Sequence, residues 1–257
     1  MEFLYFFQNT LFFNKANNEK VMTKKIRVGI ELNHVIRDIN KQIAKYYQQE
    51  YDESIDLDEI DYKEDVLNKI CNFQSEKDRI DFMYENYPLE IFGHANQVTR
   101  TLSRDLNSWI IDLTNQEEYE VEIFFYSLKE MGISIQSSYF FLSKIGSRVR
   151  TVVFPTNIEK LASLGDVFIT ANPEVVEYMH NIGKNVILMK MKFNKECRDN
   201  ANYVYKDFNE FLADKNKLDK ITKIKTQCQK SRRLSMFWTW MKSLVSFFAQ
   251  KKNETLT

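Results

Sequence analysis

The run IRVGI, Ile26–Ile30, is a short β-rich stretch near the start of the chain. Four further runs share its character: Val121–Tyr126, Thr151–Phe154, Asp166–Thr170 and Asn185–Met191. Most of these runs are apolar throughout rather than alternating, which is typical of strands buried on both faces of a parallel sheet. Helical patterns separate them, so the sequence predicts an α/β fold with a doubly wound parallel sheet of about five strands.

Helices are expected between and after these strands. The expected ranges are Asp38–Glu50, Gln97–Leu113, Ser134–Lys144, Asn157–Leu164, Glu174–Asn181 and Asp207–Lys225. Asn172-Pro173 is a good N-cap and N1 pair for the fifth of them. The first two strands are separated by about 90 residues, far more than a crossover helix needs. We therefore expect an inserted helical cap there.

These patterns divide the chain into four parts. We expect an aromatic N-terminal arm at 1–23, a Rossmannoid core at 24–40 and 115–212, a helical cap at 41–114, and a basic helical tail at 213–257.

Composition excludes several classes of protein. Hydrophobic residues make up 44% of the 257 and charged residues 28%, which is typical of a folded globular chain. No two of the six glycines lie closer than 14 residues apart, so a glycine-rich phosphate loop cannot be built. The three cysteines and three histidines are isolated, which argues against zinc sites and disulfide frameworks and favours a reducing compartment. No apolar run reaches the ~18–20 residues that a membrane-spanning helix needs.

Charge is balanced overall, with 36 basic and 36 acidic residues, but it is not spread evenly. Residues 50–90 hold 14 acidic and 4 basic side chains, whereas residues 206–257 hold 12 basic and 5 acidic ones. These segments are either solvated helical faces or, for the tail, a region that docks on an acidic surface, which could be a partner, a membrane or nucleic acid. A zero net charge argues against a specific nucleic-acid binder.

The N-terminal segment FLYFFQNTLFF, residues 3–13, contains six aromatic residues. It lacks the basic region and cleavage site of a secretory signal, so we expect a protein that is not secreted. Intracellular, cytoplasmic or virion locations fit. The arm could pack on a protein partner, and Met22 could be an alternative start.

The C-terminal segment predicts an amphipathic helix with a broad apolar face. The predicted partner-binding residues are Phe237, Trp238, Trp240, Met241, Leu244 and Phe248. Basic residues precede this segment, so three interpretations stay open: a helix on a membrane surface, a helix in a protein groove, and a plain core helix.

The run VGIELNHVIRD, Val28–Asp38, resembles the first motif of the haloacid dehalogenase (HAD) superfamily, a strand that ends in Asp-x-Asp-Gly-Val. Ser127 and Lys160 stand where the family places its Ser/Thr and its Lys. Gly165–Pro173 resembles the fourth motif, and Leu89–Ala95 resembles a cap segment of the 5′-nucleotidase-like branch. The resemblance covers residues 24–212 and implies a HAD-like fold with a helical cap.

The resemblance also implies where chemistry is lost. The nucleophilic Asp and the acid/base Asp of the family are replaced by Glu31 and Asn33, and the following Gly by His34. An Asn side chain cannot exchange a proton as a carboxylic acid does. The fourth motif has Thr170 and Ala171 where the family presents magnesium-binding Asp residues.

We therefore expect a degenerate pocket of Glu31, Asn33, Ser127 and Lys160 with no catalytic residue, no metal and no cofactor. Ser127 and Lys160 could still bind an anion, and His34 is a weak candidate base. The leading hypothesis is a non-catalytic protein that acts as an interaction or structural subunit of a larger assembly, such as a phage virion. The alternatives are a Mg²⁺-dependent phosphatase or 5′-nucleotidase that uses Glu31, and a peripheral membrane protein.

Overall fold

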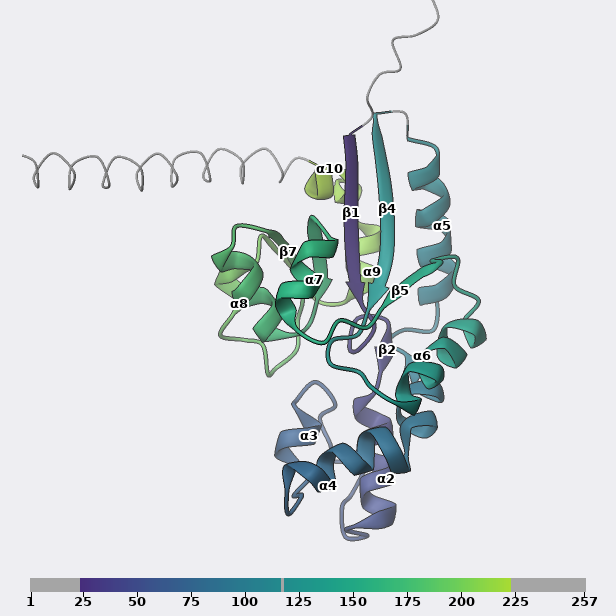
Figure 1. Ribbon diagram of the computed structural model, residues 1–257, viewed down its shortest axis with the longest axis vertical. Helices are drawn as coiled ribbons and strands as arrows, with labels where there is room; N and C mark the ends of the chain where they lie inside the picture. The colour runs from purple at the N-terminus through teal and green to yellow at the C-terminus, as the bar shows by residue number, and fades with distance from the viewer. Residues whose placement is uncertain (1–23, 117, 223–257) are drawn as a thin grey trace, which may run out of the picture.

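The computed structural model describes residues 24–116 and 118–222 (Figure 1). The whole of the predicted aromatic arm, 1–23, and most of the basic tail, 213–257, fall outside these ranges. The six predicted partner-binding residues between Phe237 and Phe248 therefore lie outside the described residues.

The core is a six-stranded sheet in which every neighbouring pair is parallel. Its strands are β1 (Lys24–Glu31), β4 (Tyr119–Tyr126), β5 (Thr151–Val153), β6 (Val167–Thr170), β7 (Asn185–Met189) and β8 (Tyr203–Tyr205). Their order is β5-β4-β1-β6-β7-β8, which reads 3-2-1-4-5-6 along the chain. This is the doubly wound order of Rossmann-type sheets. The predicted α/β class is confirmed, and the arrangement is consistent with a HAD-like Rossmannoid fold.

The prediction of about five strands is corrected to six. All five predicted runs form strands, and the additional strand β8 has the sequence YVY. Three residues are too few for periodicity to distinguish a strand from a loop.

Helices cover both faces of the sheet. On one face lie α5 (Leu102–Thr114), α9 (Phe208–Ala213) and α10 (Lys217–Thr222), and the Trp109 ring meets the Phe211 ring edge to face at 5.4 Å. On the other face lie α7 (Ile158–Leu164) and α8 (Pro173–Asn181). Figure 1 shows α5 and α7 on opposite sides of β1 and β4. As expected, α8 begins at Asn172, whose side chain accepts a hydrogen bond from the Glu174 N–H.

Between β1 and α5 the chain forms an additional layer, residues 37–97, which we call the inserted layer. Its elements are β2 (Arg37–Asp38), α2 (Asn40–Glu50), α3 (Val66–Lys69), α4 (Glu76–Ile80), the π-helices η1 (Asp81–Asn86) and η2 (Leu89–Gly93), and β3 (Asn96–Gln97). Antiparallel pairing of β2 with β3 brings its two ends together. The helices α2 and α4 lie beyond the carboxyl ends of β1 and β4 (Figure 1).

The predicted helix Ser134–Lys144 is confirmed as α6 (Ile133–Lys144), which packs against η2, so close that a Cβ on Gly93 would lie 3.2 Å from the Phe140 ring. The helix expected over Asp207–Lys225 is interrupted between α9 and α10, where Asp214 Oδ1 accepts from the Asn216 N–H at 2.8 Å. Such local side-chain bonds compete with the helical ladder.

No helix within the described ranges combines the length and apolar character that crossing a membrane requires.

Gly29 gives a test of the packing at the centre of the sheet. A Cβ there would lie 2.7 Å from Phe124 Cζ and 3.1 Å from Phe168 Cδ1. We expect Gly29→Ala to lower the free energy of unfolding by about 1–3 kcal/mol, because the buried rings must shift. Urea unfolding measures the loss, and adding Phe124→Leu should recover part of it. A double variant whose losses simply add would contradict this explanation.

Candidate functional site

The site lies where β1 and β6 end side by side. Here the sheet order reverses, and in open α/β sheets ligands bind in the crevice at such a point. Pairing of Ile30 with Ile169 sets the two strand ends together. The Glu31 side chain crosses to the end of β6, where its Oε2 atom accepts three hydrogen bonds. The donors are Thr170 Oγ1 at 2.6 Å, Ala171 N at 2.8 Å and Asn172 N at 3.3 Å.

Glu31 is only 4% exposed, and this burial shifts the pKa of its carboxyl group. Burial raises its pKa from 4.5 to about 7, against the hydrogen bonds from the β6 end and the charge of Arg37, which lower it. Glu31 is therefore poised between its neutral and charged forms near neutral pH.

Asn33 and Ser127 are brought together beside Glu31. Asn33 Nδ2 donates to Ser127 Oγ at 3.4 Å, while Asn33 Oδ1 accepts from Arg37 Nε at 2.7 Å. Ser127 is fully buried, and its N–H donates to the Val153 carbonyl at 3.2 Å. The amide oxygen of Asn33 is thus bonded to an arginine.

Arg37, a residue that sequence reasoning did not single out, is the best-connected group near the site. Its side chain is completely buried and pairs with Glu130, 2.7 Å from Nη2 to Oε2, and the Glu130 side chain is 1% exposed. Nη1 donates to Ser138 Oγ at 2.5 Å and to the Phe92 carbonyl at 3.3 Å. Ser138 donates in turn to Glu130. The guanidinium lies 4.9 Å from the centre of the Phe92 ring.

This network joins three parts of the fold, since Arg37 starts the inserted layer, Phe92 belongs to η2 and Ser138 to α6. The only sequence signal for it is the charged pair Arg37-Asp38 between the apolar residues of Val35–Ile39. Charged residues of this kind are usually solvated, so the signal is weak.

His34 stands where the resemblance to the HAD motif places a glycine, and it has a left-handed conformation, with φ +64°. That region favours Gly, but His occurs there more often than most residues. Its ring meets Phe193 edge to face at 5.5 Å. Burial lowers its pKa to about 4, with Asp65 opposing and Arg37 reinforcing the shift. His34 is therefore neutral at neutral pH.

Lys160, the last predicted pocket residue, and the two other histidines lie apart from Glu31. Lys160 is exposed, and its Nζ donates to Thr156 Oγ1 at 3.1 Å rather than lining the site. The His94 ring packs on Phe140 at 5.4 Å, and His180 lies near the end of α8 with Nδ1 3.1 Å from the Asn200 carbonyl oxygen.

Glu31, Asn33 and His34 line a cavity of about 300 Å³, the Glu31 cavity. The groups around Glu31 do not fit a magnesium ion, which needs an array of oxygen ligands. Glu31 Oε2 is surrounded by N–H and O–H donors, and the Asn33 oxygen is hydrogen-bonded to Arg37. Within residues 24–116 and 118–222, no three His, Cys, Asp or Glu side chains are grouped as metal ligands.

No protein-family model matches the sequence, and no curated protein is significantly similar to it. The chain is similar to a solved structure described as "Crystal Structure analysis of a Dehalogenase", with a TM-score of 0.42 and 10% identity. A second, described as a dehalogenase "with intermediate complex", has a TM-score of 0.40 and 8% identity. Each match covers 74% of this chain and 96% of the chain in the solved structure. Likeness this distant says nothing about activity, and the fold described above rests on the sheet order.

Removing Arg37 should strongly destabilise the fold. We expect Arg37→Met to cost about 3–5 kcal/mol in urea unfolding, because it leaves the Glu130 carboxylate buried without its partner. Adding Glu130→Gln removes that charge and should recover part of the loss. The control is Lys77→Met, which breaks an exposed pair with Asp81 (Nζ–Oδ2 3.3 Å) and should cost less than about 1 kcal/mol. Similar losses for both single variants would refute the importance of the buried pair.

Glu31 should make stability depend on pH with a definite sign. Its pKa is raised on folding, so its contribution is present below pH 4.5 and is lost as the pH rises through about 7. Relative to Glu31→Gln, the native protein should therefore lose about 3 kcal/mol of unfolding free energy across this window. His34, with its lowered pKa, changes stability in the opposite direction but is present in both proteins. Urea unfolding from pH 4 to 8 measures the difference; parallel pH profiles would contradict the shift.

Proposed function

We propose that the chain is a catalytically inactive protein of the HAD superfamily that acts by binding rather than by turnover. The superfamily assignment is supported by the order of the motifs and by their placement, since the ends of β1, β4 and β6 are neighbours in the sheet. The loss of activity is supported by one observation above all: the Glu31 carboxylate is hydrogen-bonded by three donors of the β6 end.

The chemical argument concerns the oxygen that would have to react. Three hydrogen bonds on Oε2 draw negative charge from the Glu31 carboxylate and fix its orientation against the β6 end, which makes it a poor nucleophile for in-line attack on phosphorus. In addition, Asn33 cannot protonate a leaving group. Asp65 and Glu174 also line the cavity, but within the described ranges no three His, Cys, Asp or Glu side chains are grouped as metal ligands.

The binding role is attributed to protein partners. It rests on the sequence of the aromatic arm and of the C-terminal segment, both of which lie outside the described residues. A subunit of a larger assembly, such as a virion, is the form we favour. Attachment to a membrane surface through the C-terminal segment is the competing form.

A hydrolysis assay tests the loss of activity. The purified full-length protein is incubated with p-nitrophenyl phosphate and with nucleoside monophosphates, with and without millimolar MgCl₂. We expect no rate above that of buffer and no rise in melting temperature on adding Mg²⁺, because a bound ion would stabilise the fold. Mg²⁺-dependent turnover that disappears in Glu31→Gln but persists in the exposed control Lys160→Gln would establish the phosphatase alternative instead.

A further inference from the structure

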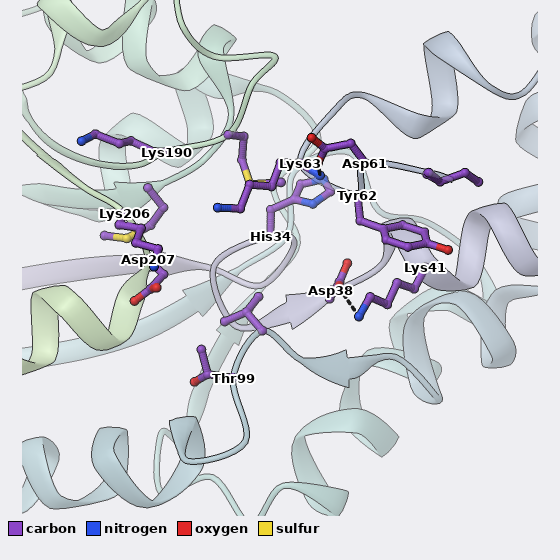
Figure 2. A pocket seen from close by; sticks show the side chains of 14 residues that line it. His34, Asp38, Lys41, Asp61, Tyr62, Lys63, Thr99, Lys190, Lys206 and Asp207 are labelled. Atoms are coloured by element: carbon purple, nitrogen blue, oxygen red, sulfur yellow. Dashed lines mark hydrogen bonds and ion pairs between the residues drawn. The ribbon is translucent and has the colours of Figure 1, made fainter. Parts of the chain in front are cut away.

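A larger cavity, of about 510 Å³, lies on the other side of His34. It opens between the inserted layer, which contributes α2 and residues 60–63, and the ends of β7 and β8 (Figure 2). Among the described residues, His34 alone lines both this cavity and the Glu31 cavity. Its volume falls within the range of ~300–1,000 Å³ that is usual for small-molecule sites. We call it the lysine cavity.

Part of its wall is apolar. The apolar lining residues are Ile60, Val98, Met189 and Met191. The Tyr62 ring adds an aromatic face and is fixed in place, since its hydroxyl donates to the Leu57 carbonyl at 2.8 Å. Methionine sulfur makes favourable contacts with aromatic rings. These groups suit a planar, aromatic occupant.

Four lysines and three aspartates also line the cavity, and the aspartates already have partners. Asp38 faces Lys41 at 4.0 Å, Asp61 pairs with Lys192 at 2.7 Å, and Asp207 accepts the Glu210 N–H at 2.9 Å as the N-cap of α9. The other three lysines have no carboxylate within ion-pair distance among the described residues. They are Lys63, Lys190 and Lys206. The excess charge in the cavity is therefore positive.

Two buried polar atoms on lining residues also lack hydrogen-bond partners in the described part of the chain. They are His34 Nδ1 and Thr99 Oγ1. Unpartnered buried polar atoms are uncommon in folded proteins, and each is costly to leave unsatisfied. Figure 2 shows both side chains at the cavity, with Lys190 and Lys206 to one side of the His34 ring and Tyr62 and Lys41 to the other.

We propose that the lysine cavity binds a small planar aromatic anion, whose ring lies against the Tyr62 and methionine side chains and whose charged group faces Lys63, Lys190 and Lys206. The proposal is independent of whether the Glu31 cavity is catalytic, because the two cavities have only His34 in common.

The test uses the full-length protein and the fluorescent aromatic anion 8-anilinonaphthalene-1-sulfonate. We expect saturable binding that becomes about tenfold weaker or more in the triple variant Lys63→Gln/Lys190→Gln/Lys206→Gln. All three side chains are exposed, so the variant should fold, which urea unfolding verifies. The matched control Lys45→Gln/Lys77→Gln/Lys195→Gln removes the same charge from exposed lysines outside the cavity and should bind as the native protein does.

Two further arms separate the cavity from general stickiness. Val98→Trp, which fills the cavity, should abolish the lysine-dependent binding. The neutral analogue N-phenyl-1-naphthylamine should bind the native protein and the triple variant equally. The proposal is overturned if the triple lysine variant and the control variant bind the anion with the same affinity, whether that affinity is unchanged or reduced.

Discussion

The buried ion pair between Arg37 and Glu130 is the constraint on which this structure depends. Two charges removed from water are tolerated only with complete hydrogen bonding, and here Asn33, Ser138 and the Phe92 carbonyl complete the set. Asn33 lies in the loop after β1, Phe92 in η2 and Ser138 in α6. The inserted layer therefore cannot shift without breaking the network. The arginine thereby holds the inserted layer in place beyond the carboxyl ends of the strands, next to the crevice at the ends of β1 and β6.

The same arginine shapes the chemistry of the site. Its charge favours the ionised form of Glu31 and disfavours the charged form of His34. It therefore acts on the pKa of both side chains, in addition to their burial. It also engages the oxygen of Asn33. In this crevice Glu31 Oε2 and Asn33 Oδ1 accept hydrogen bonds from protein donors. Our proposal of binding rather than turnover rests on these bonds.

Much of the sheet could be predicted from sequence, because strands buried on both faces need apolar side chains at consecutive positions. All five predicted runs form strands, whereas β8 was missed because three residues carry too little pattern. In the site, Glu31, Asn33 and Ser127 follow strand ends and do lie together, but Lys160 does not line the cavity. Arg37 and Glu130 were missed because they are 93 residues apart, and each alone resembles a solvated charge.

The sequence by itself determined the α/β class, the strand ends where side chains converge, and the absence of paired aspartates at those ends. These are local properties, since periodicity and residue type decide which faces are buried. Only the tertiary structure decided that Glu31 reaches the end of β6, that Arg37 is buried, and that lysines from the inserted layer and from β7 and β8 surround one cavity. Each of these depends on segments distant in the chain meeting in space, and the pairing of such segments leaves no local pattern.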